Sequence, residues 1–116
     1  YVYQGVPWQP AIPPETVVIY QGTNDAAVTP DQYAAYLRII RAAYPAARLV
    51  AIAPNRTPHA PAIRAAVAAV ADPRVAFLDY SAAFPEEDTN DGIHFNPGGA
   101  IHMGLRLADD LAKFGA

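Results

Sequence analysis

Three short apolar runs that alternate with helical patterns constrain the fold of this chain more than any other feature. The runs cover residues 16–21, 48–53 and 75–80, and each contains β-branched or aromatic side chains. Short, mostly apolar runs of this kind are typical of strands buried on both faces of a parallel sheet. The order strand, helix, strand, helix, strand, helix therefore predicts an α/β fold with right-handed crossovers.

The first helix has a recognisable start and end. Thr29 suits an N-cap, Pro30 suits the first helical position, and Gln32 completes a capping box. Pro45 ends the segment, because proline interrupts a helix interior. The side chains at helical spacing that we expect on the buried face are Tyr33, Tyr36, Leu37, Ile40 and Tyr44.

Two further helical segments complete the pattern. An alanine-rich segment at about 58–71 carries an apolar face and ends at the following Asp-Pro pair. The last helix is predicted to begin with Asn96 as its cap and Pro97 at its first position, and to reach about Phe114. The apolar face of the alanine-rich segment consists of Ile63, Val67 and Val70.

Composition excludes several classes of protein. A length of 116 residues fits one domain, and 53% hydrophobic against 16% charged residues excludes a disordered chain. A net charge of −3 gives no electrostatic reason to bind nucleic acid or an anionic membrane. No apolar run approaches the roughly 20 residues of a membrane span. Proline enrichment makes residues 1–15 an extended lead-in.

Polar segments follow each predicted strand, at 22–25, 55–59 and 81–94. The carboxyl ends of parallel strands meet at one edge of a sheet, so these segments converge there. Asp91 and His94 have a spacing that suits an acid orienting an imidazole, and the Asn24 amide suits donation to an oxyanion.

Each candidate also has a structural interpretation. Asp91 fits a simple Asn-Asp-Gly turn, and Asn24 fits an Asx turn. We expect Asp25 to hold its loop by accepting backbone amides. We expect no metal site, because His94 and His102 lack a clear third ligand. His102 is expected to be a surface or packed residue of the last helix.

Two segments together resemble the third and fifth sequence blocks of the SGNH (GDSL-type) esterase and lipase superfamily. They are Val-Ile-Tyr-Gln-Gly-Thr-Asn-Asp at 18–25 and Asp-Gly-Ile-His-Phe-Asn-Pro-Gly-Gly at 91–99. The resemblance implies a three-layer α/β/α, flavodoxin-like domain with a five-stranded parallel sheet. Residues 1–116 would be its C-terminal portion and hold the last three strands.

The resemblance also implies roles for individual residues. Asn24 would be the oxyanion-hole asparagine, His94 the general base and Asp91 the acid that orients it. Gly22 would be the block glycine, kept for its backbone conformation. His59 is expected to line the rim of the site, or alternatively to be a solvated loop residue.

The chain departs from the family pattern in three places. The Gly-Asp-Ser segment and the second oxyanion glycine, which precede the third-strand block in the family, are absent. The one serine, Ser81, follows the last strand and is interpreted as structural. Phe95 replaces a common proline. Because the strands that carry the two absent segments are also missing, one edge of the strand from Thr16 to Gln21 would need an N-terminal segment or another chain as its partner.

The preferred functional prediction is a serine esterase without a cofactor, acting on a small-molecule or carbohydrate ester with a short acyl group such as acetyl. Its serine would lie outside this chain. One alternative is a catalytically incomplete domain of the same type that serves binding or assembly. A flavodoxin-like or receiver-type signalling domain is a third option, but it would need a phosphate-binding loop or an acidic phosphoacceptor pocket. Neither is evident, since Asp25, Asp79 and Asp91 are not arranged in that pattern.

Overall fold

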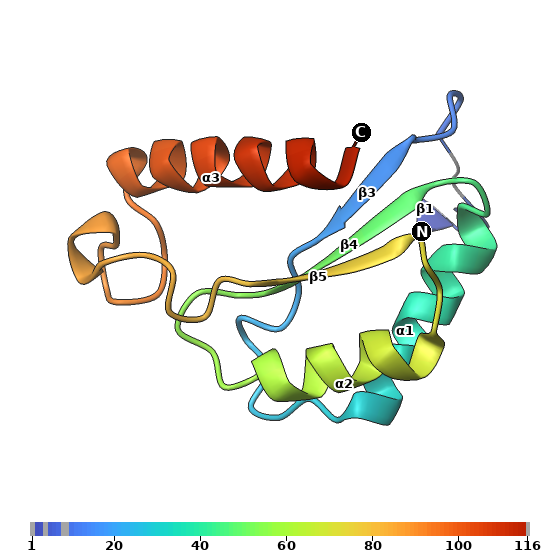
Figure 1. The fold of residues 1–116 in the computed structure, drawn as a ribbon, viewed down its shortest axis with the longest axis horizontal. Coiled ribbons are helices and arrows are strands. Elements are labelled where there is room, and N and C mark those ends of the chain that lie inside the picture. The colour runs from blue at the N-terminus through green and yellow to red at the C-terminus, as the bar shows by residue number, and fades with distance from the viewer. Residues whose placement is uncertain (1, 4, 8–9, 116) are drawn as a thin grey trace.

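The computed structural model describes residues 2–3, 5–7 and 10–115, and it has a mixed α/β fold (Figure 1). A parallel sheet has the order β3-β4-β5, so β4 is central. Its strands are β3 (Thr16–Ile19), β4 (Arg48–Ala53) and β5 (Val75–Asp79). The helices are α1 (Pro30–Ala43), α2 (Ala60–Val70) and α3 (Pro97–Gly115), and a 3-10 turn, η1, covers Glu86–Asp88.

The central strand is the most deeply buried element. Residues 49–53 of β4 are all buried between two hydrophobic clusters. On one face, Leu49 and Ala51 pack with Leu37 of α1 and Ile63 of α2. On the other face, Val50 packs in a cluster with Tyr80, Phe84, Phe95 and three α3 residues, Met103, Leu107 and Leu111. Figure 1 shows α1 and α2 on one side of the sheet and α3 on the other.

The outer strands differ from the prediction in burial and length. Val18 of β3 is 40% exposed, and most of β5 is only partly buried, so burial on both faces was wrong for these strands. Each lies at a sheet edge and has a neighbour on one side only among the described strands. Pairing with β4 ends at Ile19 and Asp79, so the strands are two and one residues shorter than the predicted runs.

The predicted helix starts are largely confirmed. Thr29 Oγ1 accepts from Gln32 N at 3.2 Å, and Gln32 Oε1 accepts from Thr29 N at 3.1 Å, which is the expected capping box. Asn96 Oδ1 accepts from Gly99 N at 2.8 Å and thus caps α3. The second helix starts two residues later than predicted, at Ala60.

Polar contacts fix α3 to the rest of the domain near its end. The Tyr80 hydroxyl donates to Asp110 Oδ2 at 2.8 Å, and both residues are buried. The same carboxylate accepts from Arg106 Nε at 2.9 Å and from Lys113 Nζ at 3.2 Å. The residue directly after β5 is therefore tied to the last two turns of α3.

An apolar groove follows the outer edge of β3. It has a volume of about 350 Å³ and is lined by β3 and by the adjoining side of α1, including Val18 and Ile39. Ile39 is 67% exposed. Among the described residues, β3 hydrogen-bonds to β4 alone, so its outer edge has no strand partner there.

The lead-in contains an element that the sequence analysis did not predict. A two-stranded antiparallel hairpin joins β1 (Val2–Tyr3) to β2 (Val6–Pro7) through a turn with Gly5 at φ +78°. Residues 8–9 of the predicted proline-rich segment lie outside the described residues, and 10–15 form no helix or strand. No helix in the described part of the chain is long and apolar enough to cross a bilayer.

Close packing at the start of α3 generates a stability prediction. A Cβ added to Gly99 would lie 1.9 Å from the Asp88 carbonyl oxygen, whereas one added to Gly104 would meet nothing within 4 Å. We expect Gly99→Ala to lower the free energy of unfolding by about 3 kcal/mol, because backbone must move. The matched control Gly104→Ala should raise it by about 0.5–1 kcal/mol through better helix propensity. Urea denaturation of both variants measures this, and equal effects would contradict the packing.

Candidate functional site

The loops that follow β3, β4 and β5 lie at the carboxyl edge of the sheet and carry the predicted site residues. Gly22 has φ +116°, which makes the tight turn after β3 possible. The Asp25 amide donates to the Gly22 carbonyl at 3.1 Å and closes this turn around Asn24. Asn24 is exposed, and within the described residues its side-chain amide makes no hydrogen bond. The Asn24 amide is thus accessible to a ligand.

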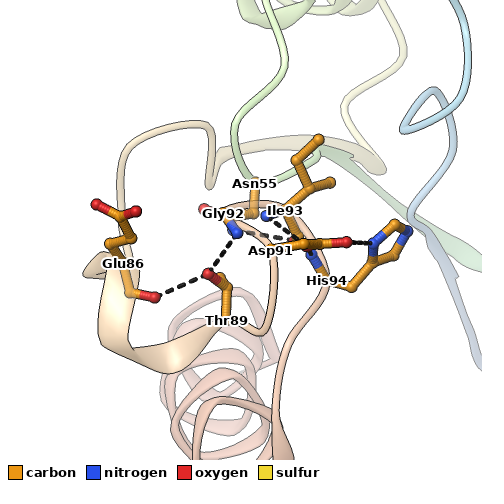
Figure 2. Close-up of polar contacts among 7 residues, drawn as sticks. All are labelled: Asn55, Glu86, Thr89, Asp91, Gly92, Ile93 and His94. Atoms are coloured by element: carbon orange, nitrogen blue, oxygen red, sulfur yellow. Dashed lines mark hydrogen bonds and ion pairs between the residues drawn. The ribbon is translucent and has the colours of Figure 1, made fainter.

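Asp91 and His94 form a direct pair, as predicted from their spacing (Figure 2). Asp91 Oδ2 lies 2.5 Å from His94 Nδ1, while Oδ1 accepts the backbone amides of Ile93 at 2.9 Å and His94 at 2.8 Å. A carboxylate partner places the ring proton on Nδ1 and leaves Nε2 as an acceptor. No hydrogen bond to Nε2 is found among the described residues, and the His94 side chain is 64% exposed.

The Asp91 carboxylate is electrostatically favoured in this loop. The backbone amide of His94, then its imidazole, and then the amide of Ile93 hold the pKa of Asp91 well below its usual range. The geometry is compatible with both interpretations of Asp91, because one oxygen accepts the backbone amides of the turn while the other contacts the imidazole. The loop presents an oriented imidazole to solvent.

Local contacts hold the Asp91 loop in place. Thr89 Oγ1 accepts from Gly92 N at 2.9 Å and donates to the Glu86 carbonyl at 2.7 Å (Figure 2). The His94 carbonyl accepts from Asn90 N at 3.0 Å. Phe95 packs edge-on against Phe84 with ring centroids 5.1 Å apart. The Phe95 ring therefore anchors the loop in the core beside α3.

No protein-family model and no curated protein matches this chain. Its likeness to the SGNH hydrolases therefore stays a prediction from the two sequence blocks.

The structure corrects the expectation for His59. This side chain is only 2% exposed, so it is neither a rim residue nor solvated. Its Nε2 lies 3.0 Å from the carbonyl oxygens of both Gly22 and Asp25. Since both partners are acceptors, Nε2 is the donor. His59 is part of the support beneath the Asn24 turn.

Asp25 holds its loop in a different way from the one predicted. The carboxylate accepts no backbone amide among the described residues. The backbone of Asp25 holds the loop instead, since its amide donates to the Gly22 carbonyl and its carbonyl accepts from His59. Side-chain reasoning missed this role because backbone groups carry no residue identity.

Ser81 and His102 lie in polar pairs away from the Asp91–His94 pair. Ser81 Oγ donates to Asp79 Oδ1 at 2.5 Å, which agrees with a structural role. His102 Nδ1 lies 2.9 Å from Asp88 Oδ1, and the His102 side chain is 62% exposed. No group of three or more potential metal-ligating side chains occurs in the described part of the chain.

Asn55 is a site residue that the sequence analysis did not single out. It follows β4, is 1% exposed, and donates through Nδ2 to the Ile93 carbonyl at 3.3 Å (Figure 2). Its backbone amide donates to the Tyr20 hydroxyl at 2.9 Å. Its position at the carboxyl end of the central strand was the available signal.

An open pocket of about 490 Å³ adjoins the Asn24 turn. Its polar lining comes from Gln21, Asp25 and Gln32, and its aromatic lining from Tyr33 and Tyr36. The two tyrosine rings meet edge to face with centroids 5.9 Å apart. Burial raises the pKa of Tyr33 above its usual range, so its hydroxyl stays protonated. The pocket offers polar and aromatic contacts to a small polar ligand.

The hydrogen bonds of Asp91 generate a testable pKa difference. We expect the carboxyl ¹³C titration of Asp91 to give a pKa well below the ordinary value of about 3.9. His94→Ala removes the imidazole but keeps the amide of residue 94, so the pKa of Asp91 should rise only part of the way. His102→Ala is the control and should leave it unchanged. A full return to the ordinary value in His94→Ala would contradict a role for the backbone amides.

The same shift fixes the sign of a pH effect on stability. Because folding lowers the pKa of Asp91, its stabilising contribution is present above the unfolded-state value and is lost as the pH falls below about 4. We expect Asp91→Asn to be less stable than the parent at pH 7 and the difference to shrink toward pH 2. Thermal unfolding at the two pH values tests this, and a difference that grows toward low pH would show the opposite linkage.

Proposed function

We propose that this chain carries the base-bearing part of an SGNH-type serine esterase with a three-layer, flavodoxin-like domain. The observation that carries the proposal is the Asp91–His94 pair, whose Nδ1 is held by the carboxylate while Nε2 is free to accept a proton. The helices on opposite sides of the parallel sheet and the exposed Asn24 amide on a neighbouring loop add support.

The proposed reaction is acyl transfer in two steps. His94 Nε2 takes the proton of a serine hydroxyl supplied from outside this chain, and the serine oxygen attacks the ester carbonyl. Asn24 donates to the tetrahedral oxyanion, while Asp91 stabilises the imidazolium. His94 then protonates the departing alcohol. Water deacylates the serine by the same route and releases the acid, with no cofactor needed for either step.

The unpartnered edge of β3 is the place we propose for the strand that brings the serine. Among the described residues no strand pairs with its outer edge, and the adjoining groove exposes Val18 and Ile39. Exposed apolar strand edges favour pairing with another strand. That strand would come from an N-terminal segment or from another chain, and its carboxyl end would lie beside the Asn24 turn.

The pocket beside the Asn24 turn supports a polar alcohol portion in the substrate. Its open shape and its mixed lining of Gln21, Asp25, Gln32 and Tyr36 suit hydroxyl groups better than a long acyl chain. We therefore favour short acyl groups, such as acetyl, on a small molecule or carbohydrate. The acyl group itself would lie near Asn24.

A binding or assembly module is the second candidate. The observation that favours it is the lack of any hydroxyl hydrogen-bonded to His94 Nε2 within the described residues. Ser81, the one serine of the chain, is already paired with Asp79. In this case the same loops would bind an ester or sugar without turnover.

Ester hydrolysis separates the two candidates. We expect no hydrolysis of a short-chain aryl ester by this chain alone, and hydrolysis once a segment of the parent protein with a Gly-Asp-Ser strand is added. His94→Ala should then lower kcat at least about a hundredfold, and Asn24→Ala by about 10²–10³. Ser81→Ala should leave the rate unchanged. Confirmed association without activity would overturn the esterase and favour the binding module.

A further inference from the structure

We propose that the loop of residues 54–59, between β4 and α2, positions the Asn24 turn and the His94 loop relative to each other. The inference rests on the proposed function for the meaning of these two loops, but its geometry is independent of it. One buried side chain of the segment, His59, reaches the loop after β3, and another, Asn55, reaches the loop after β5. We call residues 54–59 the bridging loop.

His59 forms the first contact of the bridging loop. Its Nε2–H is shared between two carbonyls, those of Gly22 and Asp25, which lie on either side of Asn24. Its ring also lies against Gly22, where an added Cβ would come within 3.2 Å of His59 Cδ2. The shared donor fixes the separation of the two carbonyls and thereby the turn that presents the Asn24 amide.

Asn55 forms the second contact. Its Nδ2 donates to the carbonyl of Ile93, the residue directly before the base His94. The opposite amide orientation would direct Oδ1 at this carbonyl, so the hydrogen bond determines the orientation. Oδ1 is buried and has no partner among the described residues. Within those residues, the Asn55 side chain therefore hydrogen-bonds only to the Ile93 carbonyl.

The bridging loop is itself held by hydrogen bonds within it and by another to Ser81, which follows β5. The Pro54 carbonyl accepts from Thr57 Oγ1 at 2.9 Å, and Arg56 N donates to the Ser81 carbonyl at 3.0 Å. Arg56 has φ +59°, a conformation kept where surrounding contacts determine it. Since the loop also continues residues 49–53 of β4, His59 and Asn55 lie just after the most deeply buried strand of the sheet.

The geometry makes His59 and Asn55 positioning residues, because neither touches the reacting atoms in the proposed mechanism. A misplacement of about 1 Å between an oxyanion donor and a base costs about a hundredfold in rate. One loop that contacts both neighbours restricts that separation directly. Each of the two contacts should act on its own loop.

Amide hydrogen exchange on this chain tests that independence. His59→Phe keeps a buried ring but removes the donor, and it should raise the exchange rate of the Asp25 amide at least about tenfold, with the Ile93 and His94 amides unchanged. Asn55→Leu keeps the branched arrangement of side-chain heavy atoms but removes the donor. It should raise the exchange rates of the Ile93 and His94 amides, with the Asp25 amide unchanged. His59→Gln, which retains a donor near the Nε2 position, should restore most of the protection of Asp25.

Amides in β4 and α1 serve as internal controls. A uniform rise across these elements would show that the two residues contribute to the core alone, and no rise in either loop would show that they hold nothing. Either result overturns the proposal. For Asn55, the more conservative Asn55→Ser should give the same loop-specific response at smaller amplitude if the larger variant fails to fold.

Kinetics of the complemented protein give a readout that a merely structural role would not change. Both variants should lower kcat about tenfold or more while KM stays within about twofold, because the loops carry groups that act in the transition state. Equal losses in kcat and KM for every substrate would contradict positioning. If the complemented protein has no activity but the loops respond separately in hydrogen exchange, the esterase proposal fails while the bridging loop remains supported.

Discussion

Parallel pairing of β4 with strands on both sides is the interaction on which the rest of this structure depends. It buries residues 49–53 completely and places the ends of β3, β4 and β5 at one edge. Side chains alternate along β4, so Leu49 and Ala51 join the α1 and α2 cluster while Val50 and Ile52 join the cluster beneath α3. Three loops distant in sequence consequently meet around the Asn24 turn and the Asp91–His94 pair.

Most of the correct fold predictions came from residues close together in the sequence. The capping box of Thr29 and the Asn96 cap lie within three residues of their partners, so sequence alone identified them. The bounds of β4 were also correct, since its neighbours bury both faces. The edge position of β3 was predicted, but a short apolar run does not show how much of each strand face stays exposed or where pairing stops, so the burial and ends of β3 and β5 were wrong. The hairpin at Gly5 was missed although glycine permits its positive φ.

In the candidate site, too, contacts between residues close in sequence were predicted and contacts between distant residues were not. Asp91 and His94 are three positions apart, and their pairing followed from spacing. His59 was misplaced because its acceptors are backbone carbonyls 37 and 34 residues away, and any residue type has a carbonyl. Asn55 was overlooked for the same reason, since its acceptor is the carbonyl of Ile93. The sequence shows which side chains can donate or accept. It does not show which distant backbone carbonyl a side chain will contact, because every residue type has one.

The attachments of α3 have a mechanical consequence. Residues 80–96 start at Tyr80, which is bound to Asp110 near the end of α3, and finish at Asn96, which caps its start. Both ends of the segment that contains His94 are thus hydrogen-bonded to one helix, so we expect a shift of α3 to shift the His94 loop as well. A substitution that slides α3 along the sheet would change the distance from His94 to Asn24 without touching either. The packing of α3 against the sheet therefore helps to set the position of His94 from a distance.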